Sequence, residues 1–107
     1  MSTVISSQRI VLTQGMITNG YLSVPKDLFP KDSWRYENTP QQALLINLNV
    51  NNEYSLRTEY SIYHNGLRRL PKIKTFFAKH ALRAGRAVVL ERISLYEYRL
   101  NLDRSIS

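Results

Sequence analysis

Apolar and polar residues alternate with a period of two along much of this chain, a pattern typical of half-buried β-strands. The clearest example is residues 54–63, which divide into two faces. The apolar face holds Tyr54, Leu56, Thr58, Tyr60 and Ile62, and the polar face holds Ser55, Arg57, Glu59, Ser61 and Tyr63. Alternating or apolar runs predict further strands at residues 9–12, 21–24, 43–50, 67–70, 87–93 and 94–102. The chain is therefore expected to be mainly β.

Turn signals separate these strands. Two glycines and a polar rim predict a loop at residues 14–20, and residues 31–42 are interpreted as a second, polar loop. Residues 51–52 (Asn-Asn) and 65–66 (Asn-Gly) predict tight turns, because these residue types tolerate positive φ. A short helical turn is expected at residues 26–29, between two prolines.

One longer helix is expected at residues 72–82, with Gly85 as its candidate C-cap. Four residues with helical spacing form its apolar face: Ile73, Phe76, Phe77 and His80. His80 is accordingly expected to be a buried, hydrogen-bonded core residue. Seven strands and two short helices in 107 residues predict a small mixed-sheet barrel.

Charge is distributed unevenly along the chain. The sequence has 15 Lys and Arg, 8 Asp and Glu, and a formal net charge of +7. Seven basic residues and no acidic residue lie between Tyr60 and Leu90: Arg68, Arg69, Lys72, Lys74, Lys79, Arg83 and Arg86. A concentrated, acid-free basic field on a small domain attracts a polyanion, most commonly DNA or RNA.

Several other classes of protein need residues that the sequence lacks. Without Cys, neither a disulfide framework nor a thiolate zinc site is possible. No apolar run approaches the roughly 20 residues of a membrane helix, and residues 1–7 do not form a signal peptide, so a cytoplasmic domain without membrane contact is expected. No His, Asp and Glu set has metal-ligand spacing, and no Gly-rich phosphate loop follows a strand. We therefore expect no catalytic residues, no metal and no cofactor.

Two parts of the chain resemble a known DNA-binding family. In order and spacing, three segments resemble the plant B-three transcription-factor domain: Tyr54-Ser55-Leu56-Arg57, Ile73-Lys74-Thr75-Phe76-Phe77 and Ala81-Leu82-Arg83-Ala84-Gly85. Residues 14–25 and 28–30 look like its prokaryotic relatives, the DNA-recognition domains of restriction endonucleases of the EcoRII, BfiI and NgoAVII kinds. Ile73-Lys74 and Gly85-Arg86 stand where the plant pattern has Gly-Trp and Gly-Asp, which favours the prokaryotic branch.

This resemblance implies a seven-stranded open pseudobarrel whose two arms clamp the major groove of double-stranded DNA. The N-terminal arm maps to residues 12–21 and the C-terminal arm to about residues 57–69. Two such arms suit a site of roughly five base pairs. A nuclease domain or subunit of the parent prokaryotic enzyme would perform hydrolysis. The residues expected to contact DNA are Gln14, Met16, Thr18, Asn19, Tyr21, Arg57, Glu59, Ser61, Tyr63, His64, Asn65, Arg68, Arg69, Lys72 and Lys74.

Other functions stay open at this point. A transcription regulator would use the same fold, and a catalytic domain is disfavoured by the missing carboxylate and His sets. A small barrel for single-stranded nucleic acid would stack bases on five tyrosines: Tyr54, Tyr60, Tyr63, Tyr96 and Tyr98. Two interpretations of Arg57 stay open: it forms two hydrogen bonds to a guanine, or it forms a cross-strand ion pair with Glu53 or Glu97.

Overall fold

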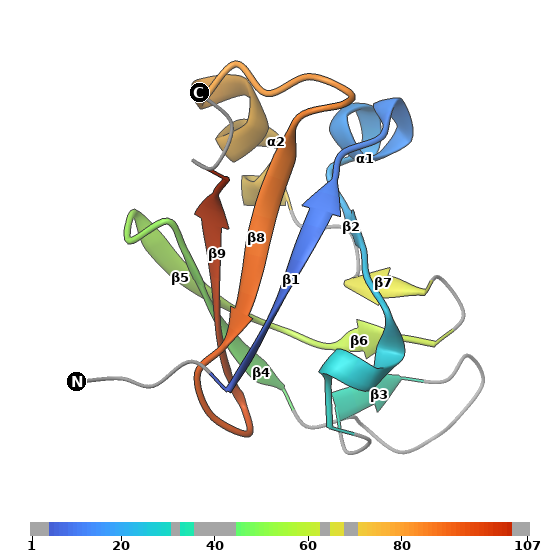
Figure 1. Ribbon diagram of the computed structural model, residues 1–107, viewed down its shortest axis with the longest axis vertical. Coiled ribbons are helices and arrows are strands. Elements are labelled where there is room, and N and C mark those ends of the chain that lie inside the picture. Colours follow the sequence, from blue (N-terminus) through green and yellow to red (C-terminus); the bar gives the residue numbers. More distant parts are fainter. Residues whose placement is uncertain (1–4, 31–32, 36–44, 63–64, 68–70, 104–107) are drawn as a thin grey trace.

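The computed structural model describes residues 5–30, 33–35, 45–62, 65–67 and 71–103 (Figure 1). The strands in these ranges are β1 (Ser6–Val11), β2 (Leu22–Ser23), β3 (Trp34–Arg35), β4 (Ile46–Val50), β5 (Tyr54–Thr58), β6 (Tyr60–Ser61), β7 (Gly66–Leu67), β8 (Ala87–Arg92) and β9 (Glu97–Leu102). The helical elements with given bounds are α1 (Gln14–Asn19), α2 (Pro71–Lys79) and the 3₁₀ turn η1 (Lys26–Leu28).

The strands form two mixed, open sheets. The larger sheet has the order β1-β8-β9-β4-β5, with antiparallel neighbours except for the parallel pair β4 and β9. The smaller sheet has the order β2-β7-β6-β3, in which β3 and β6 are parallel. Neither sheet closes on itself within the described residues. The predicted mainly β fold with a mixed sheet and two short helices is confirmed, whereas a seven-stranded barrel is not.

The alternation in the sequence builds the core. In β4, Asn47 and Asn49 face away from the core, and the residues between and beside them are fully buried. The inner faces of both sheets share one hydrophobic cluster with α2. The helix residues in this cluster are Ile73, Phe76 and Phe77, and each is at most 1% exposed.

Two buried tyrosines fix the segment after β2 against both sheets. Tyr60 of β6 and Tyr98 of β9 stack on Phe29, with ring centroids 5.0 and 4.8 Å from that of Phe29. The Tyr60 hydroxyl donates to the Val24 carbonyl and the Tyr98 hydroxyl to the Leu28 carbonyl, both at 2.7 Å. Burial raises the pKa of Tyr98 to about 12. The two rings therefore contribute apolar area while their hydroxyls remain hydrogen-bonded.

Residues 54–63 do not form the single strand that alternation predicts. β5 ends before Glu59, and the chain then enters the smaller sheet as β6. There Ser61 pairs with Gly66 on one side and with Arg35 on the other, and it is 4% exposed. The change of sheet takes Ser61 into an interior strand, so its burial gives no support to the predicted DNA contact.

The segment predicted as a loop at residues 14–20 is helix α1. The Thr13 hydroxyl accepts a hydrogen bond from Met16 N at 3.2 Å, and Gly20 ends the helix in the left-handed conformation, with φ 71°. Helical spacing turns the Met16 side chain into the core, where it is 5% exposed. This burial gives no support to the predicted contact of Met16 with DNA.

The described part of the polar loop predicted at residues 31–42 contains β3. Trp34 and Arg35 pair in parallel with Tyr60 and Ser61 of β6. The Trp34 indole N–H donates to the Phe29 carbonyl at 3.1 Å, which fixes the ring. A strand of two residues has no periodicity, so alternation cannot reveal it.

The predicted long helix is shorter than expected and ends at a different residue. The left-handed residue after α2 is Ala81, with φ 52°, whereas Gly85 lies in the next turn, with φ 94°. Ala81 N donates to Ala78 O at 3.1 Å, and Leu82 N donates to Phe77 O at 2.9 Å. These two bonds define a Schellman motif, in which glycine is the usual left-handed residue.

Ala81→Gly is expected to raise the free energy of unfolding by about 0.5–1 kcal/mol. A left-handed alanine costs about 1–2 kcal/mol, and the greater backbone entropy of glycine in the unfolded chain cancels part of that gain. Chemical denaturation measures the change. Ala78→Gly, at an exposed position inside α2, is the control and should cost about 1 kcal/mol. A loss in Ala81→Gly as large as in the control would contradict this interpretation.

Candidate nucleic-acid interface

Both α-helices lie at the same end of the molecule, together with the loop that joins α2 to β8 (Figure 1). This loop is hydrogen-bonded to the start of the predicted N-terminal arm. Gly85 N donates to Leu12 O at 2.9 Å, and Leu12 N donates to Arg86 O at 2.8 Å. The N-terminal arm at residues 12–21 and the end of the acid-free basic stretch therefore share one surface.

We call this surface the basic end. It consists of the exposed residues Gln14, Thr18, Asn19, Lys72, Lys74, Arg83 and Arg86. The Lys72 ammonium lies 5.4 Å from the centroid of the Tyr54 ring, a cation–π contact. Lys74, Arg83 and Arg86 form no ion pair with any residue that the structure describes. Their charges are thus available to an anionic partner.

The polar side chains of α1 keep hydrogen-bonding groups available. Gln14 Nε2 donates to Thr18 Oγ1 at 3.1 Å, and Asn19 Nδ2 donates to Gly15 O at 3.1 Å. Each amide still has its carbonyl oxygen and a second N–H. These are the two groups with which Asn and Gln pair with the edge of adenine in the major groove.

Glu53 joins α2 to the turn between β4 and β5. Its carboxylate accepts hydrogen bonds from Lys79 Nζ at 2.8 Å and Asn51 Nδ2 at 2.9 Å, and it lies 2.6 Å from His80 Nε2. These bonds, with that of Lys79 the strongest, lower the pKa of Glu53 to about 2. His80 is thus hydrogen-bonded as predicted, but it is half-buried beside a carboxylate rather than enclosed in the core.

Arg57 lies on the exposed face of the larger sheet and not at the basic end. It pairs across β5 and β4 with Asn47, which in turn pairs with Glu97 of β9. The predicted alternative, an ion pair with Glu53 or Glu97, does not form in the described part of the chain. Glu53 is engaged by α2, and Glu97 accepts from the Ser94 hydroxyl at 3.2 Å. The guanidinium of Arg57 is therefore exposed on a rigid strand.

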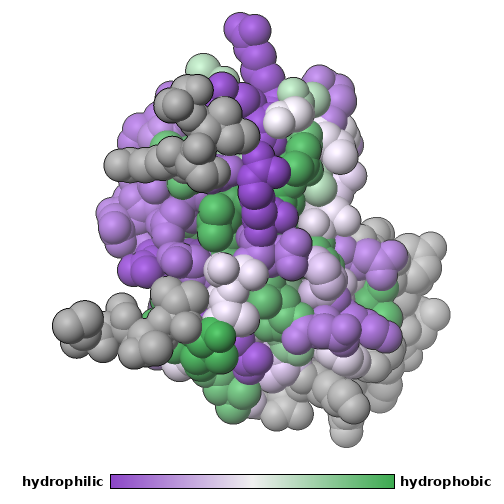
Figure 2. Space-filling view, in the orientation of Figure 1, coloured by the Kyte–Doolittle hydropathy of each residue, from purple (hydrophilic) through white to green (hydrophobic). Residues whose placement is uncertain are grey.

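Other polar residues of this sheet face are hydrogen-bonded to one another. Glu91 accepts from Arg99 Nε at 3.0 Å and from Asn101 Nδ2 at 2.6 Å. Arg9 of β1 pairs with Asp103 at 2.7 Å. Figure 2 shows a column of hydrophilic residues over β1 and β8, with hydrophobic surface beside it. Arg9 and Arg99 of this face are therefore paired, whereas Arg57 forms no ion pair with a described residue.

Asn65 belongs to the described part of the predicted C-terminal arm. Its φ is 53°, as expected for a tight turn, and its carbonyl accepts from Val24 N at 3.1 Å and from the Ser23 hydroxyl at 3.4 Å. Its side chain is exposed and borders an open hollow of about 540 Å³ that Lys26 and Asp27 also line. Asn65, Lys26 and Asp27 therefore border the same hollow.

The structure divides the predicted DNA contacts into four groups. Exposed residues are Gln14, Thr18, Asn19, Arg57, Asn65, Lys72 and Lys74. Tyr21 and Glu59 are partly buried, and Met16 and Ser61 are buried. Tyr63, His64, Arg68 and Arg69 lie outside the described residues. Arg83 and Arg86 were not among the predicted contacts. Their positions in the acid-free basic stretch were the sequence signal that could have identified them.

The tyrosines proposed as a base-stacking platform do not form one in the described ranges. Tyr60 and Tyr98 are each 1% exposed and stack on Phe29 inside the core. The Tyr54 ring contacts the Lys72 ammonium, and the Tyr54 hydroxyl donates to the Lys72 carbonyl at 2.7 Å. Stacking on single-stranded bases requires exposed rings, so this alternative loses its main support.

No group of three or more His, Asp or Glu residues in the described ranges is arranged to hold a metal ion. None of the described helices has the length and hydropathy to cross a membrane.

Comparison with known proteins gives no relative. No family model matches the sequence, and no curated protein and no solved structure is significantly similar to it.

Proposed function

We propose that this chain is a sequence-specific double-stranded DNA-binding module, the target-recognition domain of a prokaryotic restriction endonuclease. The observation that carries the proposal is the basic end. There Lys74 and Arg83, which form no ion pair with a described residue, belong to α2 and the loop after it, at the same end of the molecule as α1 with its exposed amides. A surface that combines free cations with amide side chains suits a duplex, which offers phosphates and base edges together.

The fold is compatible with the open pseudobarrel that the resemblance implies. Two open, mixed sheets enclose one core, and the segment between β1 and β2 corresponds to the predicted N-terminal arm. α1 forms the body of the N-terminal arm. A helix of this kind fits the major groove, which is about 12 Å wide.

Each part of the surface has a distinct role in the proposal. Lys74 and Arg83 contact phosphates and set the register of the protein on the duplex. Gln14 and Asn19 of α1, and Arg57 and Asn65 of the C-terminal arm, read base edges. Hydrolysis is assigned to a nuclease domain or subunit of the parent enzyme, acting in the cytoplasm.

Selection of bound duplexes from a random pool, followed by sequencing, tests the proposal. A sequence-specific module enriches one short motif of roughly five base pairs. Single-stranded competitors should displace the selected duplex poorly, and incubation of the isolated chain with Mg²⁺ should leave the duplex uncut. Enrichment without any motif, or stronger binding to single strands, would contradict the proposal.

Arg57→Ala is expected to weaken binding to the selected duplex by about 1–3 kcal/mol, with little change in binding to random duplex or in folding. The reason is that a guanidinium on a rigid strand grips guanine through two hydrogen bonds. Fluorescence anisotropy with both duplexes measures the two affinities. Lys74→Ala is the matched control and should weaken both duplexes equally, because phosphates carry no sequence information. Equal losses for Arg57→Ala would make Arg57 a phosphate contact instead.

A further inference from the structure

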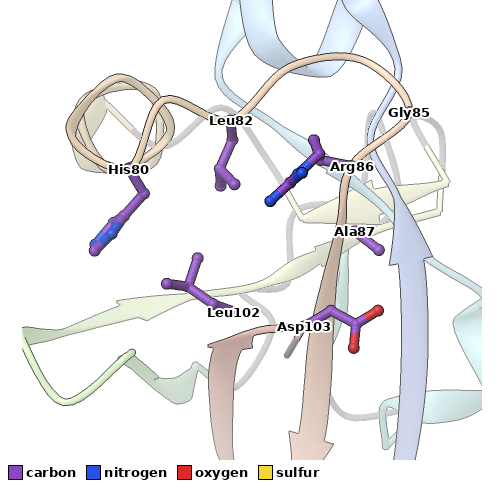
Figure 3. Close-up of a pocket in the computed structure, with 7 residues that line it drawn as sticks. All are labelled: His80, Leu82, Gly85, Arg86, Ala87, Leu102 and Asp103. Atoms are coloured by element: carbon purple, nitrogen blue, oxygen red, sulfur yellow. The ribbon is translucent and has the colours of Figure 1, made fainter. Parts of the chain in front are cut away.

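A pocket of about 430 Å³ lies where the end of α2, the following loop and the ends of β8 and β9 meet (Figure 3). Its volume falls in the range of small-molecule sites, about 300–1,000 Å³. Its apolar wall consists of Leu82, Ala87 and Leu102. His80, Arg86 and Asp103 supply its polar groups, and Gly85 completes the lining.

Two of the three polar groups already have partners. Asp103 pairs with Arg9 at 2.7 Å, and its side chain is 6% exposed. In Figure 3 its carboxylate points away from the space between Leu82 and Leu102. His80 lies 2.6 Å from the Glu53 carboxylate, so its ring forms a wall of the pocket while its Nε2 is engaged.

Arg86 is the polar group of the pocket whose side chain has no partner among the described residues. Its guanidinium points into the pocket between Leu82 and Leu102 (Figure 3), and it forms no ion pair with a described residue. Its backbone is fixed on both sides, because Arg86 N donates to Arg83 O at 3.0 Å and its carbonyl accepts from Leu12 N at 2.8 Å. A cation on a fixed backbone above an apolar wall is a preorganised site for an anion with an apolar body.

We propose that this pocket binds a small organic anion, with Arg86 holding its carboxylate or phosphate group and Leu82, Ala87 and Leu102 packing against its apolar body. The guanidinium fork matches both oxyanions through two parallel hydrogen bonds. The charge balance around the site favours an anion, since Asp103 and Glu53 are each neutralised by other cations. Arg86 belongs to the basic end, but this site does not depend on the DNA contacts proposed for Lys74 and Arg83.

The test is a titration of the whole chain, with its Ala and Leu methyl groups labelled, followed by NMR. The probes are benzoate and phenyl phosphate, with neutral benzamide and inorganic phosphate as matched controls. Benzoate or phenyl phosphate should shift the methyl signals of Leu82, Ala87 and Leu102 with saturation. Benzamide, which lacks the charge, and inorganic phosphate, which lacks the apolar body, should each bind at least about tenfold more weakly.

Arg86→Gln and Arg83→Gln separate a built site from general charge attraction. Both variants lose one positive charge from the same loop, but Arg83 does not line the pocket. Affinity for the better probe should fall about tenfold or more in Arg86→Gln and stay within about twofold in Arg83→Gln, with the melting temperature confirming that both are folded. Equal losses in both variants, equal binding of benzamide, or the absence of saturable methyl shifts would overturn the proposal. Because no nucleic acid is present, failure here is distinguishable from failure of DNA binding.

Discussion

Phe77→Ala is expected to lower the free energy of unfolding by about 3–5 kcal/mol, with a matching fall in melting temperature. Phe77 is 1% exposed, belongs to the hydrophobic core cluster and lies in the last turn of α2. Removing its ring leaves a cavity between the helix and the sheets, which the surrounding side chains fill only in part. Phe76→Ala should have a similar effect, because Phe76 is equally buried.

Calorimetry or chemical denaturation measures these losses, and Thr75→Ala provides the control. Thr75 is exposed on the same helix, so its replacement should change stability by no more than about 0.5 kcal/mol. The folded fraction of Phe77→Ala should still bind duplex DNA. If the variant instead kept full stability and lost DNA binding, the assignment of this helix face to the core would be wrong.

Gly66→Ala is the second substitution with a large expected effect, about 3 kcal/mol or more. A Cβ at this position would overlap the Leu22 carbonyl oxygen and lie 2.9 Å from Ser23 Cα. Both atoms belong to the backbone of β2, which pairs with β7 and cannot move aside as a side chain would. The glycine is therefore needed for the close approach of two strands.

Gly15→Ala is the matched control for Gly66→Ala. A Cβ at Gly15 would approach the Tyr21 hydroxyl oxygen at 3.1 Å, and that atom is the far end of a side chain. Alanine also favours the helical backbone of α1, so this variant should be neutral or slightly more stable. Thermal unfolding measures the stability of both variants and tests this prediction. A Gly66→Ala protein as stable as the wild type would show that β2 and β7 do not pair as described.

The parts of the fold that could be predicted are those with sustained periodicity. Residues 43–50, 87–93 and 94–102 were predicted as strands, and β4, β8 and β9 lie inside these ranges. Their inward side chains are buried by direct consequence of the alternation, as Leu48, Leu90 and Leu100 illustrate. The apolar spacing of Ile73, Phe76 and Phe77 likewise located α2.

The remaining elements depend on contacts between distant parts of the chain. β3 and β6 have two residues each and exist because they pair with one another. Helix α1 has six residues, and its caps Thr13 and Gly20 are the local signal that distinguishes it from a loop. That signal was present in the sequence, but the two glycines of the segment favoured a loop.

The sequence indicated which residues contribute to the candidate site but not how the fold brings them together. The acid-free stretch contains Lys74, Arg83 and Arg86, and the exposed position of Arg57 follows from its strand face. The hydrogen bonds of Leu12 to Gly85 and Arg86, which join the N-terminal arm to the basic loop, connect residues far apart in the sequence. No local pattern encodes such a contact.

The salt dependence of binding to the selected duplex tests DNA recognition by the basic end most directly. Log affinity should fall linearly with log salt concentration, with a slope of about −0.9 for each phosphate contacted. The double variant Lys74→Gln, Arg83→Gln should reduce this slope by about 1.8 for duplexes of any sequence, while Arg57→Ala should lower affinity for the selected duplex alone. A wild-type slope near zero, or an unchanged slope in the double variant, would contradict DNA binding at the basic end.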